Sequence, residues 1–164
     1  AEAVGNFIQI RGMVLDENCT PIQGAVIEIW QADAKGHYEW EYNSNSHWKL
    51  PLDGKDKNFQ FSGSAQTDNL GQYNLMTIFP GAKEESAPYI NVIVKRKGYD
   101  ELYTRIYFVN HPRNSEDSVL SKLNNESKES ITAKGRSIDS KNPQEGRIYY
   151  FPITLSGIGA YKRF

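Results

Sequence analysis

Residues 88–94, with the sequence PYINVIV, decide the fold class of this chain. The run is short and rich in β-branched side chains, so it reads as a β-strand. Alternate side chains of a strand share a face, so Tyr89, Asn91 and Ile93 lie on one side and the other aliphatic residues on the opposite side. A phenol beside a carboxamide on one face marks either the floor of a chemical site or the place where the sheet meets water.

The same pattern extends along the chain in both directions. Its apolar stretches are short, rich in β-branched and aromatic residues, and separated by Gly, Pro, Asn and Asp, which is typical of a β-sandwich or barrel. We predict strands at residues 7–15, 24–32, 59–67, 71–78, 88–97, 101–109 and 146–155. Seven strands suffice for two packed sheets.

Two polar turns join consecutive strands of this prediction. Residues 16–24, DENCTPIQG, carry a proline and a glycine, and residues 67–73, TDNLGQY, place Gly71 where a positive φ is useful. Both turns are interpreted as hairpin connections.

Two longer segments do not fit as strands. Residues 34–58 are rich in aromatic side chains, so we expect them to pack on the sheet as a lid or as one wall of a pocket. Within residues 111–145, the stretch SEDSVLSKL predicts a short helix over residues 115–123, capped by Ser115. The rest of that segment is expected to cross the surface.

Composition limits the function classes. The chain has 164 residues, enough for one domain over residues 1–164 that buries roughly 70% of its unfolded surface. A net charge of −1 gives no bulk electrostatic argument for nucleic acid or for an anionic membrane surface. Cys19 is the only cysteine, which excludes an internal disulfide and any multi-cysteine metal site.

Nothing in the sequence predicts membrane insertion, because no apolar run reaches the about 18 residues that a spanning helix needs. The first residues, AEAVGNF, lack the basic and apolar regions of a signal peptide. Their small side chains also fit the end that remains after such a peptide is removed. The sequence is therefore compatible with a cytoplasmic or an exported protein.

Four stretches, taken together, resemble a known family. They are GMVLDENCTPIQGAVIEIWQAD at 12–33, FQFSGSAQTDNLGQYNLMTIFPG at 59–81, APYINVIV at 87–94 and LYTRIYF at 102–108. In order and spacing they are similar to the intradiol ring-cleaving dioxygenases, especially the protocatechuate 3,4-dioxygenase type. The resemblance covers residues 8–108, with 146–155 as the closing strand. It implies an all-β, Greek-key β-sandwich of the intradiol dioxygenase (prealbumin-like) type, with long loops and one short helix.

The resemblance also implies a non-haem ferric ion between two tyrosinates and two histidines, donors that suit this ion. In this sequence the four ligand positions are occupied by Trp48, Lys83, Tyr89 and Asn91. An indole has no lone pair to offer a metal, and an ammonium repels a cation. We therefore expect no catalytic residue, no metal ligand and no cofactor, although the family's cofactor is Fe(III).

If a pocket persists at the former metal position, its chemistry changes. Arg105 aligns with a glutamine of the family, so Lys83 and Arg105 bring two cations to the pocket. Trp48 and Tyr89 would form apolar walls, and Asn91 would both donate and accept hydrogen bonds. These five residues predict a site for a small anionic or aromatic ligand.

A filled pocket is the competing interpretation. In that case Lys83 points to solvent, Arg105 pairs with Glu84 or Glu85, and Tyr89 occupies the space that the metal left. The chain would then be a structural interaction module of the transthyretin-like type without a ligand.

The expected function is a non-catalytic binding or interaction protein that has lost ferric iron and ring cleavage. The alternative is an active dioxygenase with a rearranged ligand set, in which Tyr89 binds iron and His47 moves in. Since members of the family commonly oligomerise, assembly of several chains is also an expectation.

Overall fold

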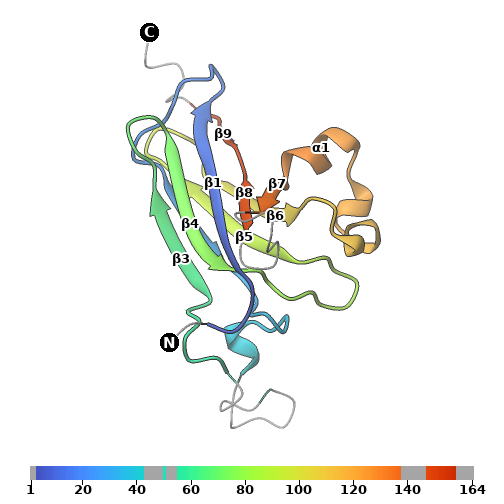
Figure 1. The fold of residues 1–164 in the computed structure, drawn as a ribbon. Helices are drawn as coiled ribbons and strands as arrows, with labels where there is room; N and C mark the ends of the chain where they lie inside the picture. The colour runs from blue at the N-terminus through green and yellow to red at the C-terminus, as the bar shows by residue number, and fades with distance from the viewer. Residues whose placement is uncertain (1–2, 43–49, 51–54, 138–146, 158–164) are drawn as a thin grey trace.

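The computed structural model, drawn in Figure 1, describes residues 3–42, 50, 55–137 and 147–157. Within these ranges nine strands form one sheet, and eight of them follow a single path of paired neighbours. The strands are β1 (Phe7–Asp16), β2 (Val26–Trp30), β3 (Ser62–Gln66), β4 (Gln72–Ile78), β5 (Tyr89–Lys95), β6 (Leu102–Phe108), β7 (Thr132–Ser137), β8 (Arg147–Tyr150) and β9 (Ile153–Leu155). Their order is β3-β2-β5-β6-β7-β8-β1-β4, and β9 pairs with β1.

The described residues contain one α-helix, α1 (Asn125–Ser130), and three short 3₁₀ helices at Glu39–Glu41, Pro112–Glu116 and Leu120–Lys122. The strand-rich class predicted from the sequence is therefore confirmed, and one short α-helix is present as expected, although not at the predicted position. Within these ranges, every helix is too short or too polar to span a bilayer.

The alternation of buried and partly exposed side chains in β5 shows which face of this strand covers the core. Ile90, Val92 and Val94 are fully buried, whereas Tyr89 and Asn91 on the other face are partly exposed, as the sequence predicts. The buried aliphatic side chains of β5 pack in one cluster with those of β1, β2 and β4. The strand path thus curves around a shared core, and the β3 and β4 ends of the path come close to each other without pairing.

Neither predicted hairpin forms. β1 pairs with β4, β8 and β9, whereas β2 pairs with β3 and β5, so residues 16–24 carry the chain between different parts of the sheet. β3 and β4 lie at opposite ends of the path, so residues 67–73 do the same. Gly71 does adopt a φ of +75°, but turn residues fix only a change of direction and not the partner strand.

The prediction of a helix over residues 115–123 is wrong. Asp117 has an extended backbone, with ψ 128°, and its carboxylate accepts hydrogen bonds from the backbone N–H groups of Val119 and Leu120. Asp117 is thus the C-cap residue of one 3₁₀ helix, and its carboxylate binds backbone N–H groups at the start of the next. The α-helix begins later, where the Asn124 side chain accepts the N–H of Ser127 at 2.8 Å.

The segment 111–145 also contains a strand that we did not predict. Its polar sequence, TAKGRS, lacks apolar alternation, yet β7 pairs with both β6 and β8. Gly135 permits this pairing because a Cβ there would lie 2.4 Å from the Tyr149 ring. The predicted strand 146–155 is divided into β8 and β9 at Pro152, which has no N–H to donate.

Candidate functional site

The polar face of β5 meets the same face of β6. In the antiparallel register, Tyr89 lies opposite Tyr107, and Asn91 lies opposite Arg105. Because opposite residues of neighbouring strands share a face, these four side chains form one group on the side away from Ile90, Val92 and Val94. Tyr38 lies in the described part of the aromatic-rich segment 34–58, which we call the aromatic loop. Its hydroxyl accepts a hydrogen bond from Asn91 and so joins these side chains. We call these five residues the tyrosine–arginine cluster.

Arg105 is the centre of the cluster. Its guanidinium carbon lies 4.1 Å from the centroid of the Tyr89 ring, and its Nη1 donates to the hydroxyl of Tyr107 at 3.0 Å. Burial disfavours the charged form, but the hydrogen bond with Tyr107 and the charge interactions with Tyr89, Tyr107 and Asp117 together outweigh this effect, so the pKa of Arg105 lies above its ordinary value. The cluster therefore holds a permanent positive charge stacked on an aromatic ring.

A buried carboxylate supports this arrangement from behind. The fully buried hydroxyl of Tyr107 lies 3.2 Å from Oδ1 of Asp117 and can donate to it. Burial acts to raise the pKa of Asp117, but the backbone N–H groups of Leu120, Ala87 and Val119 hold it below its ordinary value. Asp117 therefore stays charged and holds Tyr107, the hydrogen-bond partner of Arg105, in place.

Asn91 connects the cluster to the aromatic loop. Its Nδ2 donates to the backbone carbonyl of Trp30 at 3.2 Å and to the hydroxyl of Tyr38 at 3.0 Å. Burial raises the pKa of Tyr38 well above its ordinary value, and a hydrogen bond with the Tyr89 side chain raises it further. Tyr38 is therefore a neutral phenol at physiological pH.

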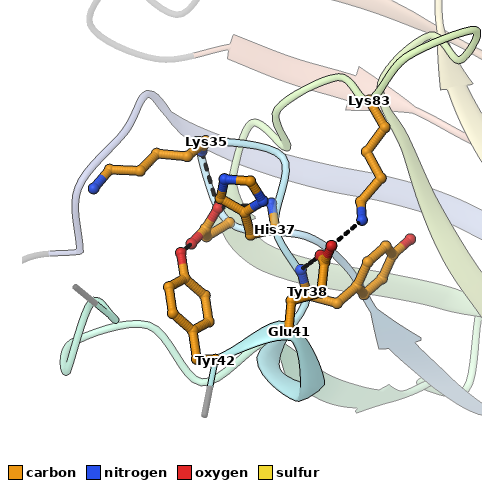
Figure 2. A network of polar contacts seen from close by, with 7 residues as sticks. Lys35, His37, Tyr38, Glu41, Tyr42 and Lys83 are labelled. Carbon is orange, nitrogen blue, oxygen red and sulfur yellow. Dashed lines mark hydrogen bonds and ion pairs between the residues drawn. The ribbon is translucent and has the colours of Figure 1, made fainter. Parts of the chain in front are cut away.

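Lys83 lies next to Tyr38, as Figure 2 shows. Its Nζ is 2.5 Å from Oε1 of Glu41, and it lies over the rings of Tyr38 and Trp40 at 5.3 Å and 5.6 Å from their centroids. The other carboxylate oxygen of Glu41 accepts the Tyr38 backbone N–H at 2.5 Å. Burial alone would raise the pKa of Glu41, but the contact with Lys83 and the Tyr38 backbone N–H together lower it below its ordinary value.

Asp33 holds this loop in place. Its Oδ1 accepts the backbone N–H groups of Lys35 and His37, each at 3.0 Å, and its Oδ2 accepts the hydroxyl of Tyr42. Asp33 is itself buried. Because three donors from residues 35–42 converge on one carboxylate, the loop is ordered around it and presents Tyr38 to β5.

The comparison with known proteins identifies the family. A protein-family model described as dioxygenase matches residues 1–157. The α chain of protocatechuate 3,4-dioxygenase from Pseudomonas putida is 29% identical to this chain, over 96% of this chain and 75% of the α chain. The chain belongs to the intradiol dioxygenase family. The resemblance stated from the sequence motifs is therefore confirmed.

Other members of the intradiol family match shorter parts. The β chain of protocatechuate 3,4-dioxygenase from Burkholderia cepacia is 38% identical over 49% of this chain and 32% of the β chain. Among solved structures, the dioxygenase domain of a dioxygenase carbohydrate-binding protein fusion from Streptomyces sp. SirexAA-E has 25% identity and a TM-score of 0.71 over 96% of this chain and 84% of that chain.

A second solved structure, 3-chlorocatechol 1,2-dioxygenase from Rhodococcus opacus 1CP, has the same TM-score of 0.71. It is 22% identical and covers 95% of this chain but 62% of its own. This second likeness concerns the fold alone. The intradiol fold is thus present over almost the whole chain, whereas several relatives are considerably longer.

The structure brings together three of the five residues that the sequence singled out. Tyr89, Asn91 and Arg105 lie in the tyrosine–arginine cluster. Lys83 lies beside Tyr38 and bonds Glu41, so the interpretation in which it points to solvent is wrong, because the aromatic loop supplies a partly buried acid as its partner. Arg105 bonds Tyr107 rather than Glu84 or Glu85. Trp48 and His47 lie outside the described residues.

Sequence reasoning missed four contributors, which are Tyr38, Glu41, Tyr107 and Asp117. Tyr107 could have been found, because it shares the period-two face of Arg105 on β6. Tyr38 carried a weaker signal as one of several aromatic residues in residues 34–58. Asp117 gave no signal in the sequence, because its hydrogen bond with the Ala87 N–H joins two segments that are 30 residues apart.

Proposed function

We propose that this member of the intradiol dioxygenase family does not hold ferric iron and acts as a non-catalytic protein that binds a small anionic aromatic ligand. The binding site would be the tyrosine–arginine cluster, on a Greek-key sandwich of the prealbumin-like type. One observation carries the proposal: a guanidinium lies 4.1 Å above the Tyr89 ring. A fixed cation therefore lies beside one of the positions that the family resemblance assigns to a ferric ligand.

The other cluster residues support the absence of iron. Asn91 directs N–H donors at Tyr38 and at a carbonyl oxygen, whereas a metal ligand must present a lone pair. The raised pKa of Tyr38 opposes the tyrosinate that ferric iron needs. Among the described residues, no group of three or more His, Cys, Asp or Glu side chains is placed to hold a metal ion. The residues present do not fit the family's ferric centre.

The same residues fit an aromatic carboxylate. A guanidinium has five N–H donors, and the contact with Tyr107 uses one nitrogen, Nη1, which leaves Nε and Nη2 for a bidentate carboxylate. The phenol groups of Tyr38 and Tyr89 supply an aromatic surface and polar hydroxyls next to that fork. Charge recognition would thus come from Arg105 and ring recognition from the tyrosines.

Iron loading and calorimetric binding test the proposal together. Protein purified with ferric iron supplied should be colourless and metal-free by elemental analysis. 4-Hydroxybenzoate should bind about tenfold or more tighter than the uncharged 4-hydroxybenzamide, because a charge-assisted hydrogen bond contributes roughly 1.5–3 kcal/mol. Arg105→Gln should remove this preference. Arg96→Gln, which removes a guanidinium bonded to the Gln23 carbonyl instead, should retain it.

An active dioxygenase with a rearranged ligand set is the alternative function. The observation in its favour is that Tyr89 lies near enough to Tyr38 to raise the pKa of its phenol, so two phenol groups lie in one cluster. It requires bound iron, a visible tyrosinate-to-iron absorption band and cleavage of a catechol by the loaded protein. Any of these results would reject the non-catalytic proposal.

A structural module without a ligand is the third function. The satisfied contact between Lys83 and Glu41 favours it, because this cation already has a partner. Under this alternative the loaded protein is again colourless, but 4-hydroxybenzoate and 4-hydroxybenzamide bind equally weakly. The two experiments together therefore separate all three functions.

A further inference from the structure

A cavity lies where the two ends of the strand path meet. β3 and β4 are the terminal strands of the path, and no backbone ladder joins them. Between them opens a cavity of about 420 Å³, a volume within the range of small-molecule sites. Its apolar lining comes from Phe7, Ile29, Phe59, Phe61, Met76 and Ile78.

The polar floor of this cavity has a fixed orientation. Gln31 is almost completely buried, and its Nε2 donates to the carbonyl oxygens of Ile78 at 2.9 Å and Ala32 at 3.3 Å. Its Oε1 therefore faces Thr77, whose hydroxyl donates to it at 2.7 Å. Because carbonyl oxygens only accept, the amide cannot be reversed without losing both of its bonds to backbone carbonyls.

The floor consequently offers acceptors and no free donor. The amide protons of Gln31 and the hydroxyl proton of Thr77 are already used. A lone pair remains on the Thr77 oxygen and another on Oε1 of Gln31. The described residues that line the cavity include the neutral polar side chains of Asn58, Gln60 and Ser62 but no ionisable side chain, so a charged group inside it would have no oppositely charged partner.

The cavity wall combines a buried aromatic residue with a positive φ and an exposed methionine. Phe61 is buried with a φ of +63°, an uncommon conformation for a residue other than glycine, and its ring lies 4.7 Å from that of Phe59. Met76 is 62% exposed at the opposite side, and methionine adapts its shape to an apolar ligand. A flat ring would thus contact aromatic and thioether groups.

We propose that this cavity is a binding site for a neutral ring compound that carries one O–H or N–H donor. The ring would fill the apolar space between β3 and β4, and its donor would bond the acceptors of Thr77 and Gln31. Ile29, in the cavity wall, lies on the opposite face of β2 from Trp30, whose carbonyl contacts the tyrosine–arginine cluster. The inference is thus independent of the function proposed for that cluster.

Methionine-methyl NMR tests the site directly, because the chain has two methionines. Met76 lines the cavity and Met13 does not. Phenol should shift the Met76 methyl signal saturably and leave that of Met13 in place, with ring-to-methyl nuclear Overhauser contacts to Met76. It should bind about threefold to tenfold tighter than anisole, which lacks the donor, and benzoate should not bind. Equal binding of phenol and anisole, binding of benzoate, or an unmoved Met76 signal overturns the proposal.

A matched pair of variants checks the location. A Cβ at Gly63 would meet only Ile29, at 3.9 Å, so Gly63→Val adds volume inside the cavity without a backbone clash. It should abolish phenol binding, whereas Ser64→Val, one residue further along β3 and outside this cavity, should leave it unchanged. Retained binding in Gly63→Val refutes the assignment. If Gly63→Val does not fold, the Overhauser contacts in the unmodified protein decide.

Discussion

Replacing Asp117 by asparagine should destabilise the protein strongly although the side chain keeps its size. Asp117 is 1% exposed and lies in the segment that leads away from β6. Its two oxygens lie within hydrogen-bond distance of five donor groups, which are the backbone N–H groups of Val119, Leu120 and Ala87 at 2.9 Å each, the Tyr107 hydroxyl at 3.2 Å and the Ser86 hydroxyl at 3.3 Å. A carboxylate can accept from all of them, but an amide has one acceptor oxygen.

The magnitude follows from these contacts. With the amide nitrogen in the position of Oδ2, the buried N–H of Ala87 faces another donor, which costs about 1–3 kcal/mol. The two backbone bonds that remain at Oδ1 lose their charged acceptor, at roughly 1 kcal/mol each. We therefore expect Asp117→Asn to lower the free energy of unfolding by about 3–5 kcal/mol. For a chain of this length, this corresponds to a fall in Tm of roughly 6–20 °C.

The loss should depend on pH in a defined direction. Because the pKa of Asp117 is lowered on folding, its contribution is fully present above the unfolded pKa of about 3.9 and is lost as pH falls through the folded pKa. Urea unfolding at pH 7, 5 and 3.5 should show the two proteins converging at the lowest pH. Asp68→Asn is the matched control, since Asp68 accepts two backbone N–H groups in an exposed turn and should lose less than about 1 kcal/mol. A difference that is equal at all three pH values would refute the reasoning.

Three further substitutions test other contacts by thermal unfolding or NMR. Gly12→Ala should lower the free energy of unfolding by about 3 kcal/mol or more, because a Cβ would lie 2.1 Å from a backbone oxygen. The control, Gly63→Ala, should change it by less than about 0.5 kcal/mol, because the nearest atom to a Cβ there lies at 3.9 Å. Tyr73→Phe should lower it by about 1–3 kcal/mol, because the buried hydroxyl donates to a backbone carbonyl between β8 and β9. Lys83→Gln should raise the pKa of Glu41 in a carboxyl-carbon titration, with a stability loss below about 1 kcal/mol because the pair is partly exposed.

The sequence predicts the individual strands better than their pairing. The alternation of Ile90, Val92 and Val94 with polar neighbours is a local signal, and it identifies both the strand and its buried face. The partner of a strand depends instead on the whole core. Gly71 shows this, since its positive φ was predictable but its turn packs on Val14 of β1 and does not close a hairpin.

The same distinction applies to the site. Tyr89, Asn91 and Arg105 could be placed on one face because period-two alternation acts within a strand and between neighbouring strands. The partner of Lys83 could not be predicted, because Glu41 reaches it from a 3₁₀ helix about 40 residues earlier. Such contacts depend on how loops fold over the sheet, for which the polar sequence of a loop holds little signal.

The contacts of the cluster form one continuous chain across the sheet, from Asp117 through Tyr107 and Arg105 to the Tyr89 ring. Such a chain can serve two purposes, and its energetics separate them. If it only fastens the segment after β6, Arg105→Gln leaves the Tyr107 hydroxyl with a neutral partner and lowers stability without changing any affinity. If it instead orients a charged fork for a ligand, the same variant loses affinity for 4-hydroxybenzoate while its unfolding free energy stays nearly constant. The ratio of these two losses therefore measures how far the arginine serves binding rather than folding.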